Sequence, residues 1–432
     1  MKKVTFNFVA VFFSLVLLSS NLLSKEVKQE NEQSRLEALT KFTKVLGIVE
    51  KYDVDKVTIN ELIDKALDGM MKNLDAHSNY LTQKDYKRLK VQTDGEFGGL
   101  GITVGMKDGA LTVIAPLDDT PAYKAGLKSG DIIIKINDKP TLNMTIDEAV
   151  SLMRGKIGDP IDIMIVRKGE SKPFKVHIVR GKITIKSVYA KTIGKDILYI
   201  RVASFDKKVV KDVKKAILKN KKTTKGIILD LRNNPGGLLD QAVGLVNLFV
   251  DDGVIVSQKG REKSDNKFYK ANASSTVTDK PMVVLVNGGS ASASEIVSGA
   301  LQDHKRAVLV GEKTFGKGSV QVVLPINKTE AIKLTIARYY LPTGRTIQAV
   351  GVTPDIKVLP GEVKTYENEY SIKEADLKEH LKKELAKVET KKVKAKAKKK
   401  DKKDIITSKM LNKDIQLKEA VDIIEALAII KG

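Results

Sequence analysis

The sequence predicts an α/β protein with an inserted β-rich domain and helical segments at both ends. Between Ile183 and Ile356, compact apolar strands alternate with helices, as in an α/β layer. Residues 96–182 instead combine short β-rich runs with Gly and Asp turns. The flanking segments repeat apolar residues at helical spacing. The length of 432 residues leaves room for several domains of this kind.

The chain begins with "MKK" and the apolar stretch "FVAVFFSLVLLSS", which is short for a membrane span and typical of a secretory signal peptide. We therefore expect export, to the periplasm. The following "SSNLLSK" lacks an A-x-A cleavage pattern, so an uncleaved anchor in the inner membrane is the alternative. The predicted segments are a signal peptide (1–24), a helical N-terminal domain (25–93), a β-rich domain (94–182), an α/β core (183–358), and a Lys-rich linker with a C-terminal helix (359–432).

Composition excludes several classes of chemistry. The chain has no cysteine, which excludes thiol catalysis and thiolate metal sites. Much of the net charge of +23 lies in the run Lys382–Lys403, most simply a solvated linker, with attraction to an anionic surface or partner as the alternative. Aromatic residues are scarce and not interleaved with this run, so no nucleic-acid partner is expected. No metal is expected, because four scattered histidines show no ligand spacing: His77, His177, His304 and His380.

The first half of the chain carries clear element signals. Thr58 and Glu61 have the spacing of a capping box that opens a helix. A second helix is predicted from Thr145, in "TIDEAVSLMRG". The runs "PIDIMIVRKG" and "KPFKVHIVRG" predict a hairpin closed at "KGES". His177 lies in the second of these strands, and its alternating pattern favours a structural role.

The second half predicts four apolar strands, in "ILYIRVAS", "GIILDLRN", "MVVLVNGG" and "AVLVGEK". Helices follow the second and third strands, in "LLDQAVGLVNLFV" and "ASEIVSGALQDHK". Functional sites tend to form where such strands end, so the turns after them are candidates. The chain ends in an amphipathic helix through Ile415, Ala420, Ile424 and Leu427.

The stretch "GEKTFGKGS", from Gly311 to Ser319, resembles a phosphate-binding loop at first sight. Such a loop requires G-x-x-x-x-G-K-[ST] opening a helix. Here Gly318 occupies the hydroxyl position, and the strand-like run "VQVVLPI" follows. Without a helix N-terminus to face the phosphates, nucleotide binding is not expected. The glycines indicate a tight turn that carries Lys317 close to other backbone.

A candidate nucleophile lies in "VNGGSASASEI", where a strand ends and small residues open a helix. A serine in this first turn lies beside free backbone N–H groups, as a nucleophile with an oxyanion site requires. An ordinary helix cap is the simpler alternative. His304 lies twelve positions after Ser292 on the same predicted helix, about 18 Å away and too far to act as its base. A lysine can replace it if desolvation, here by glycines and Phe315, lowers its pKa towards about 7–8.

These motifs carry a family resemblance. The runs "GSASASE", "FGKGSVQ" and "DLRNNPGG" resemble those of carboxyl-terminal processing peptidases, or tail-specific proteases, of the S41 type. The resemblance extends from about Leu36 to Ile356 and includes "NLDAHSNYL" and "YYLPTGRTIQAVGVTPDI". It implies a crotonase-like (ClpP/crotonase-type) α/β core. It also implies a Ser–Lys dyad of Ser292 and Lys317, with Gln321 as the assisting amide.

The same resemblance implies an oxyanion hole formed by the backbone N–H groups of Gly237 and Ala293. Many members carry a third glycine where this chain has Pro235, which removes one N–H donor. The β-rich segment resembles a PDZ domain, with "GGLGI" matching the loop that binds a C-terminal carboxylate. The residues of this loop are Gly99, Leu100, Gly101 and Ile102. A plain Gly-rich strand entry is the alternative, although "DTPAYKAGLKSGDIIIKIN" follows in PDZ order.

Together these features predict an exported serine endopeptidase that captures apolar C-terminal tails of protein substrates at its PDZ domain. No cofactor is expected. The family resemblance implies a homo-oligomer, a dimer or larger, and allows an adaptor protein. The main alternative is a non-catalytic PDZ scaffold that binds tails. A crotonase-type acyl-CoA enzyme would not explain the PDZ module, and a nucleic-acid binder would depend on net charge alone.

Overall fold

The computed structural model describes residues 33–363 and 405–430. The described residues form two compact units: one holds those up to Thr82 together with Val323–Leu334, and the other holds the rest. The predicted signal peptide, the lysine run at 382–403 and His380 lie outside the described residues. None of the described helices combines the length and the apolar character that a membrane crossing needs.

The first unit is built on two helices and a strand. Residues 33–52 are helical, and α2 (Ile59–Leu74) begins at the predicted capping box. The Thr58 N–H donates to Glu61 Oε2 at 2.9 Å, and the Glu61 N–H donates back to Thr58 Oγ1 at 3.3 Å. The segment predicted to be helical also contains a strand, β1 (Asn79–Leu81). It forms because β1 pairs with residues 331–333, burying Tyr80 and Leu81.

The β-rich module begins after α3 (Gln83–Asp94). A two-stranded ribbon of β2 and β9 connects it to the rest of the chain, and a six-stranded sheet has the order β3-β4-β5-β7-β8, with β6 on β5. The predicted hairpin is confirmed as β7 and β8, and the predicted helix as α5. The elements are β2 (Glu96–Gly99), β3 (Ile102–Lys107), β4 (Ala110–Pro116), α4 (Pro121–Lys124), β5 (Ile132–Ile136), β6 (Lys139–Pro140), α5 (Ile146–Met153), β7 (Pro160–Val166), β8 (Phe174–Val179) and β9 (Gly181–Thr184).

The α/β core contains a seven-stranded sheet of order β19-β16-β15-β12-β11-β10-β20. The four predicted strands are confirmed as β11, β12, β15 and β16, and they run parallel. The strands are β10 (Val188–Ile193), β11 (Ile197–Val202), β12 (Gly226–Asp230), β15 (Met282–Val286), β16 (Val308–Gly311), β19 (Ile356–Lys357) and β20 (Ile405–Ile406). The helices are α6 (Val209–Asn220), α7 (Leu239–Asn247), α8 (Ala293–Asp303), α10 (Ser408–Leu411) and α11 (Ile415–Ile430).

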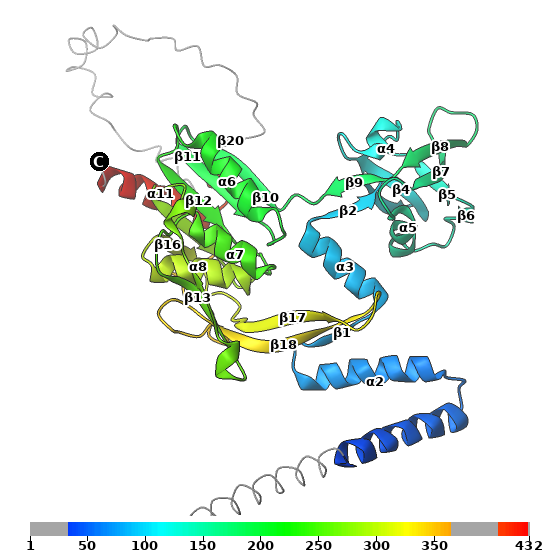
Figure 1. Cartoon of the computed structure of the whole chain (residues 1–432). Coiled ribbons are helices and arrows are strands. Elements are labelled where there is room, and N and C mark those ends of the chain that lie inside the picture. Colours follow the sequence, from blue (N-terminus) through cyan, green and yellow to red (C-terminus); the bar gives the residue numbers. More distant parts are fainter. Residues whose placement is uncertain (1–32, 364–404, 431–432) are drawn as a thin grey trace, which may run out of the picture. The chain divides into compact units, whose positions relative to one another are not determined.

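Alternate residues of each strand point to opposite faces of this sheet, and helices cover both faces. Leu229 and Val284 pack with α6, α7 and α8 on one face. Ile228 and Leu285 pack on the other face with α11, the red helix in Figure 1. The predicted C-terminal helix is therefore part of the core, and Leu417 and Ile424 are among its buried residues.

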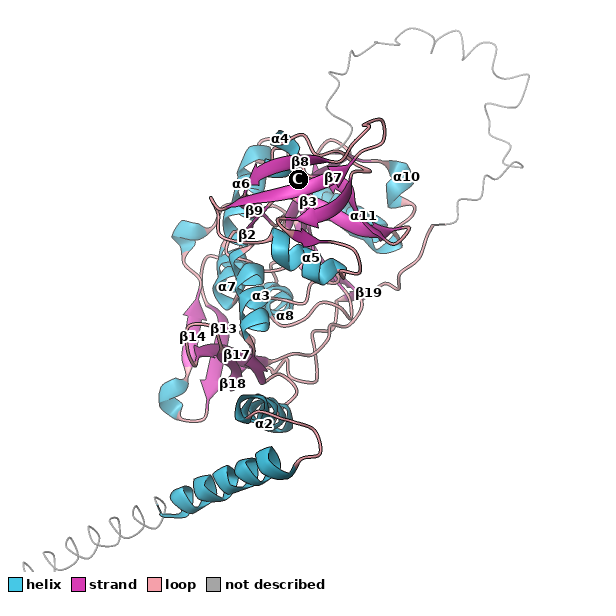
Figure 2. Ribbon diagram, turned by 90° about the vertical axis from the view of Figure 1, so that its right-hand side faces the viewer, coloured by secondary structure: helices cyan, strands magenta, loops and turns pink. Residues whose placement is uncertain are grey.

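A second, five-stranded sheet contains β1 together with β13, β14, β17 and β18, and Figure 2 shows these last four strands gathered. Its elements are β13 (Val254–Gly260), η1 (Lys263–Asp265), β14 (Lys267–Lys270), η2 (Ala273–Ser275), β17 (Ser319–Pro325) and β18 (Ala331–Tyr340).

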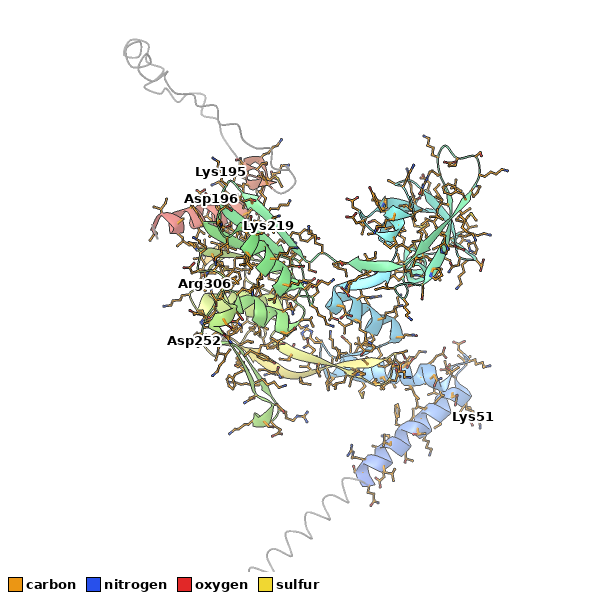
Figure 3. All side chains as sticks on the ribbon, turned by 45° about the horizontal axis from the view of Figure 1, so that its top comes forward. Lys51, Lys195, Asp196, Lys219, Asp252 and Arg306 are labelled. Atoms are coloured by element: carbon orange, nitrogen blue, oxygen red, sulfur yellow. The ribbon has the colours of Figure 1, made fainter. Side chains whose placement is uncertain are left out.

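The two ends of the parallel sheet differ in character. At one end, the turn before β11 holds Lys195 and Asp196, both labelled in Figure 3, and Asp196 pairs with Lys225 before β12 at 3.0 Å. At the opposite end, β12 and β15 lie side by side and run into the "NNPGG" and "SASAS" turns. Gly237, Ser292 and Ala293 therefore follow the carboxyl ends of two neighbouring strands.

Candidate active site

The nucleophile turn connects the end of β15 at Val286 to the start of α8 at Ala293. Ser292 is the last residue of this turn, is half-buried, and has a φ of 55°. A non-glycine residue in this conformation costs about 1–3 kcal/mol and persists only where its surroundings fix it. The turn thus presents a serine on strained backbone at a strand-to-helix junction, as nucleophiles of hydrolases are presented.

The loop after β12 lies directly against this turn. The Asn234 carbonyl accepts a hydrogen bond from the Ala291 N–H and another from the Ser294 hydroxyl, both at 2.9 Å. A Cβ added at Gly236 would lie 2.9 Å from Ser292 Cβ, closer than real Cβ contacts. Only glycine therefore allows the loop to approach the serine this closely.

Two backbone donors near Ser292 have no acceptor within residues 33–363 and 405–430. Pro235 has no N–H, and the Gly236 N–H donates to Asn234 Oδ1 at 2.9 Å. The next group, the Gly237 N–H, and the first group of α8, the Ala293 N–H, make no bond to a described residue. Because Pro235 has no N–H and the Gly236 N–H is already bonded, Gly237 provides the N–H donor of this loop that has no acceptor among the described residues.

The lysine loop between β16 and β17 is fixed by one buried carboxylate. Glu295 is fully buried; its Oε1 accepts from the Gly316 N–H at 2.7 Å and the Thr314 hydroxyl at 2.6 Å. Its Oε2 accepts from the Lys317 N–H and from the Ser292 N–H, both at 2.8 Å. A single side chain thus binds the backbone of both candidate dyad residues.

Glu295 is not among the site residues predicted from the sequence. A signal was present, because a Glu three positions after a Ser at a helix start has capping-box spacing. That spacing explains the bond to Ser292, but the bonds to the lysine loop join segments 21 and 22 positions apart.

The rest of the lysine loop agrees with the predicted tight turn. A strand follows Lys317, as predicted, and the Gly318 N–H donates to Gln348 Oε1 at 3.0 Å. Lys317 is half-buried. Phe315, which was expected to help desolvate the lysine, is 64% exposed. The Phe315 N–H instead donates to the Ser290 carbonyl.

The predicted assisting amide, Gln321, lies in β17 two residues after Ser319. Its Nε2 donates to Ser319 Oγ at 2.8 Å and to Thr335 Oγ1 at 3.3 Å. These bonds orient the amide within the β17–β18 hairpin, on the strand that continues from the lysine loop.

His304 and His177 lie at the end of the helix and in the strand that the sequence predicts for them. His304 ends α8, at the opposite end from Ser292, and its Nε2 donates to the Val254 carbonyl at 2.8 Å. Arg306, labelled in Figure 3, follows it and donates to the Phe249 carbonyl. His177 lies in β8, paired with a neighbouring carboxylate. Among the described residues, no group of three His, Cys, Asp or Glu side chains could hold a metal ion.

The predicted carboxylate loop lies between β2 and β3. The Leu100 carbonyl accepts from the Ala122 N–H, and the Gly101 carbonyl accepts from the Thr120 hydroxyl at 3.0 Å. Because a trans peptide points its N–H opposite to its carbonyl, the N–H groups of Gly101 and Ile102 face the other way. Gly101 has a φ of 76°, and an added Cβ would lie 2.3 Å from Thr120 Cβ, so the loop requires glycine.

The strand after this loop, β3, is an edge strand, because it pairs only with β4 in its sheet. Helix α5 packs against β3 and begins with a capping box at Thr145. An edge strand beside a helix can accept an extended peptide as an added strand, while the loop N–H groups bind its terminal carboxylate.

Comparison with known proteins agrees with this arrangement. The sequence model of peptidase family S41 matches residues 196–358, and that of the PDZ domain matches residues 98–178. The chain belongs to peptidase family S41 and is a serine-type C-terminal processing peptidase with a PDZ domain.

Two relatives define this membership. A carboxy-terminal-processing protease of Bartonella bacilliformis is 43% identical over 392 residues, which is 88% of each chain. The carboxy-terminal processing protease CtpA of Bacillus subtilis is 37% identical over 323 residues, covering 74% of this chain and 69% of the relative. Among solved structures, a photosystem II D1 C-terminal processing protease is 27% identical with a TM-score of 0.42, covering 73% of this chain and 92% of its own.

Proposed function

We propose that this peptidase cleaves peptide bonds with a dyad in which Ser292 is the nucleophile and Lys317 is the base. The observation that carries the proposal is the convergence of three groups at the ends of β12 and β15. A strained serine, two N–H donors without acceptors and the lysine loop meet there, and Glu295 binds both the serine and the lysine backbone. Gln321, in the strand β17 that follows the lysine loop, is the proposed assisting amide.

The chemistry follows from these positions. Neutral Lys317 accepts the Ser292 proton as Oγ attacks the carbonyl carbon of the scissile bond. The N–H groups of Gly237 and Ala293 donate to the oxyanion that forms on the carbonyl oxygen. Protonated Lys317 then gives its proton to the leaving amine, and a water attacks the acyl-enzyme by the same route. We call residues 233–237 the oxyanion loop.

Substrate capture is assigned to the PDZ domain. We propose that the loop Gly99–Ile102 binds the terminal carboxylate of a protein tail and that β3 pairs with its last residues. Apolar tails are the expected ligands. The same proposal includes the predicted domain boundaries, with a crotonase-like core at residues 183–358.

We further propose that residues 1–24 direct export to the periplasm, with retention in the inner membrane if they are not removed. A homo-oligomer, a dimer or larger, and an adaptor protein remain proposals from the family resemblance.

The test of this function is cleavage of an unfolded protein with an apolar C-terminus. The chain from Lys25 onward is compared with its Ser292→Ala and Lys317→Ala variants. We expect cleavage by the unsubstituted chain only, with tail binding retained by all three. Equal cleavage by all three would place the chemistry elsewhere. Tail binding without cleavage by any of them would favour the scaffold alternative.

A further inference from the structure

Arg232 directly precedes the oxyanion loop, and its side chain binds the C-terminal segment, residues 405–430. The Arg232 side chain is 12% exposed, and its guanidinium forms a bidentate pair with Asp414, NH1 to Oδ1 and NH2 to Oδ2, each at 2.8 Å. NH1 also donates to Gln416 Oε1 at 2.9 Å, and Nε donates to Asp230 Oδ1 at 3.0 Å. Planar, two-pronged pairs of this kind fix orientation as well as distance.

The two partners of Arg232 are themselves held in place. Asp414 Oδ1 accepts from the Leu417 N–H at 3.0 Å, and Gln416 Nε2 donates to the Val358 carbonyl at 2.8 Å. The segment that carries them adds β20 as a strand beside β10 and packs α11 on the sheet. Arg232 is therefore fixed by a segment 182 positions away in sequence.

The backbone on either side of Arg232 is bound to the nucleophile turn. The Asn233 N–H donates to Asn287 Oδ1 at 2.8 Å, and the Leu231 carbonyl accepts from the Ser290 hydroxyl at 2.8 Å. Arg232 thus lies between two anchors, the nucleophile turn through its neighbours and the C-terminal segment through its own side chain. A change at Asp414 reaches the oxyanion loop through one residue.

We propose that Asp414 and Gln416 are positioning residues for peptide hydrolysis. Through Arg232 they set the place of the oxyanion loop, and with it the Gly237 N–H. The C-terminal segment therefore supports catalysis by positioning the oxyanion loop, in addition to packing on one face of the sheet. The inference rests on the proposed function, because it requires the Gly237 N–H to contact the oxyanion.

The test uses the chain from Lys25 onward with Asp414→Asn, which turns one carboxylate acceptor into an N–H donor facing Arg232. The matched control is Asp422→Asn, in the helix α11 that follows Asp414, where the carboxylate pairs with Lys418 at the surface. A second control is Ile424→Ala, which loosens the packing of α11 without touching Arg232.

Four quantities are measured: kcat and KM for a tail peptide substrate, affinity for a peptide aldehyde, and affinity for a non-cleavable tail. A peptide aldehyde forms a tetrahedral adduct whose oxygen occupies the oxyanion site, so its affinity reports on transition-state binding. For Asp414→Asn we expect kcat and aldehyde affinity to fall together by about tenfold or more, since a lost oxyanion donor costs about 10²–10³ in kcat. KM and tail binding should change less than about twofold.

The result that overturns the inference is a kcat for Asp414→Asn equal to that of Asp422→Asn. A fall in kcat that Ile424→Ala reproduces would also overturn it, because loosening of the helix would then explain the loss. Failure of the proposed function looks different: Ser292→Ala would retain cleavage, whatever Asp414→Asn does.

Discussion

At the scale of single residues, Gly236 shows how little room the site leaves. Its φ is 99°, and an added Cβ would meet Ala291 O at 2.8 Å and Ser292 Cβ at 2.9 Å. We expect Gly236→Ala to lower kcat by about 100-fold or more, the size of effect seen when an oxyanion donor is lost. Gly194→Ala is the matched control, because Gly194 also has a positive φ but nothing within 4 Å. Equal activity of the two variants would show that the oxyanion loop is free to move.

Glu295 gives a second prediction at this scale. Glu295→Gln keeps the shape of the side chain but replaces one carboxylate oxygen with an NH2 group. That group donates hydrogen bonds and so opposes the backbone N–H groups that Glu295 accepts from. Loss of hydrogen bonds to a charged group costs about 1.5–3 kcal/mol, so both the free energy of unfolding and kcat should fall. Urea unfolding and steady-state kinetics measure these two effects. Glu37→Gln, at an exposed helix position, should change neither. Full activity in Glu295→Gln would mean that the Ser292 and Lys317 backbones hold their places without this carboxylate.

The residues that the sequence could indicate are those in local motifs. Ser292 and Lys317 each lie in a short run whose glycines and small residues mark a turn. The sequence could not predict that Glu295 links the two turns, because the link requires two loops that are apart in the sequence to lie close together in the fold. The exposure of Phe315 was missed for the same reason, since solvent exposure in a turn is set by what packs against it.

At the scale of elements, period and capping signals predicted most strands and helices of the described residues. Helix α6 was overlooked, although Val209, Val213 and Ile217 repeat at helical spacing and are buried. Strand β1 could not be predicted, because three residues become a strand only by pairing with β18. Predicting the C-terminal helix did not predict its docking, since burial of α11 requires one face of a sheet whose strands are far apart in the sequence.

The buried ion pair of the PDZ domain supplies an element-scale prediction. Arg167 donates to both carboxylate oxygens of Asp131, which has 1% of its side chain exposed. Removing one partner of a buried pair costs about 3–5 kcal/mol. We therefore expect Arg167→Met to destabilise the domain by that amount, measured by hydrogen exchange of the β5 and β7 amides. Lys168→Met, at an exposed neighbour, is the control and should leave this exchange unchanged.

The same pair predicts a pH dependence. Burial raises the pKa of Asp131, but hydrogen bonds from Arg167 and the Lys128 N–H outweigh it and hold that pKa below its usual range. A carboxyl with a lowered folded-state pKa contributes stability above its unfolded value of about 3.9, and this is lost as pH falls through the folded value. The unsubstituted domain should therefore lose protection in that acid range. Arg167→Met should lack this part of the dependence, and an identical acid profile would contradict the assignment.

At the scale of the whole molecule, the C-terminal segment closes one face of the main sheet. Ile424 is 1% exposed and packs over Gly226, where an added Cβ would lie 2.3 Å from Ile424 Cγ2. We expect Ile424→Ala to lower the free energy of unfolding by about 2–5 kcal/mol, measured in urea. Ile429→Ala, at a side chain that is 81% exposed, should stay within about 0.5 kcal/mol of the unsubstituted chain. Similar values for both would mean that α11 does not pack on the sheet in solution.

The central claim is that Ser292 is the residue acylated by substrate and that Lys317 removes its proton. The most direct measurement is to mix the chain from Lys25 onward with a peptide ester, quench with acid, and locate the acyl group by mass spectrometry. The account predicts an acyl group on Ser292, none in Ser292→Ala, and a rate of formation about 10²–10⁴-fold lower in Lys317→Ala. An acyl group on another residue, or an unchanged rate without Lys317, would contradict it.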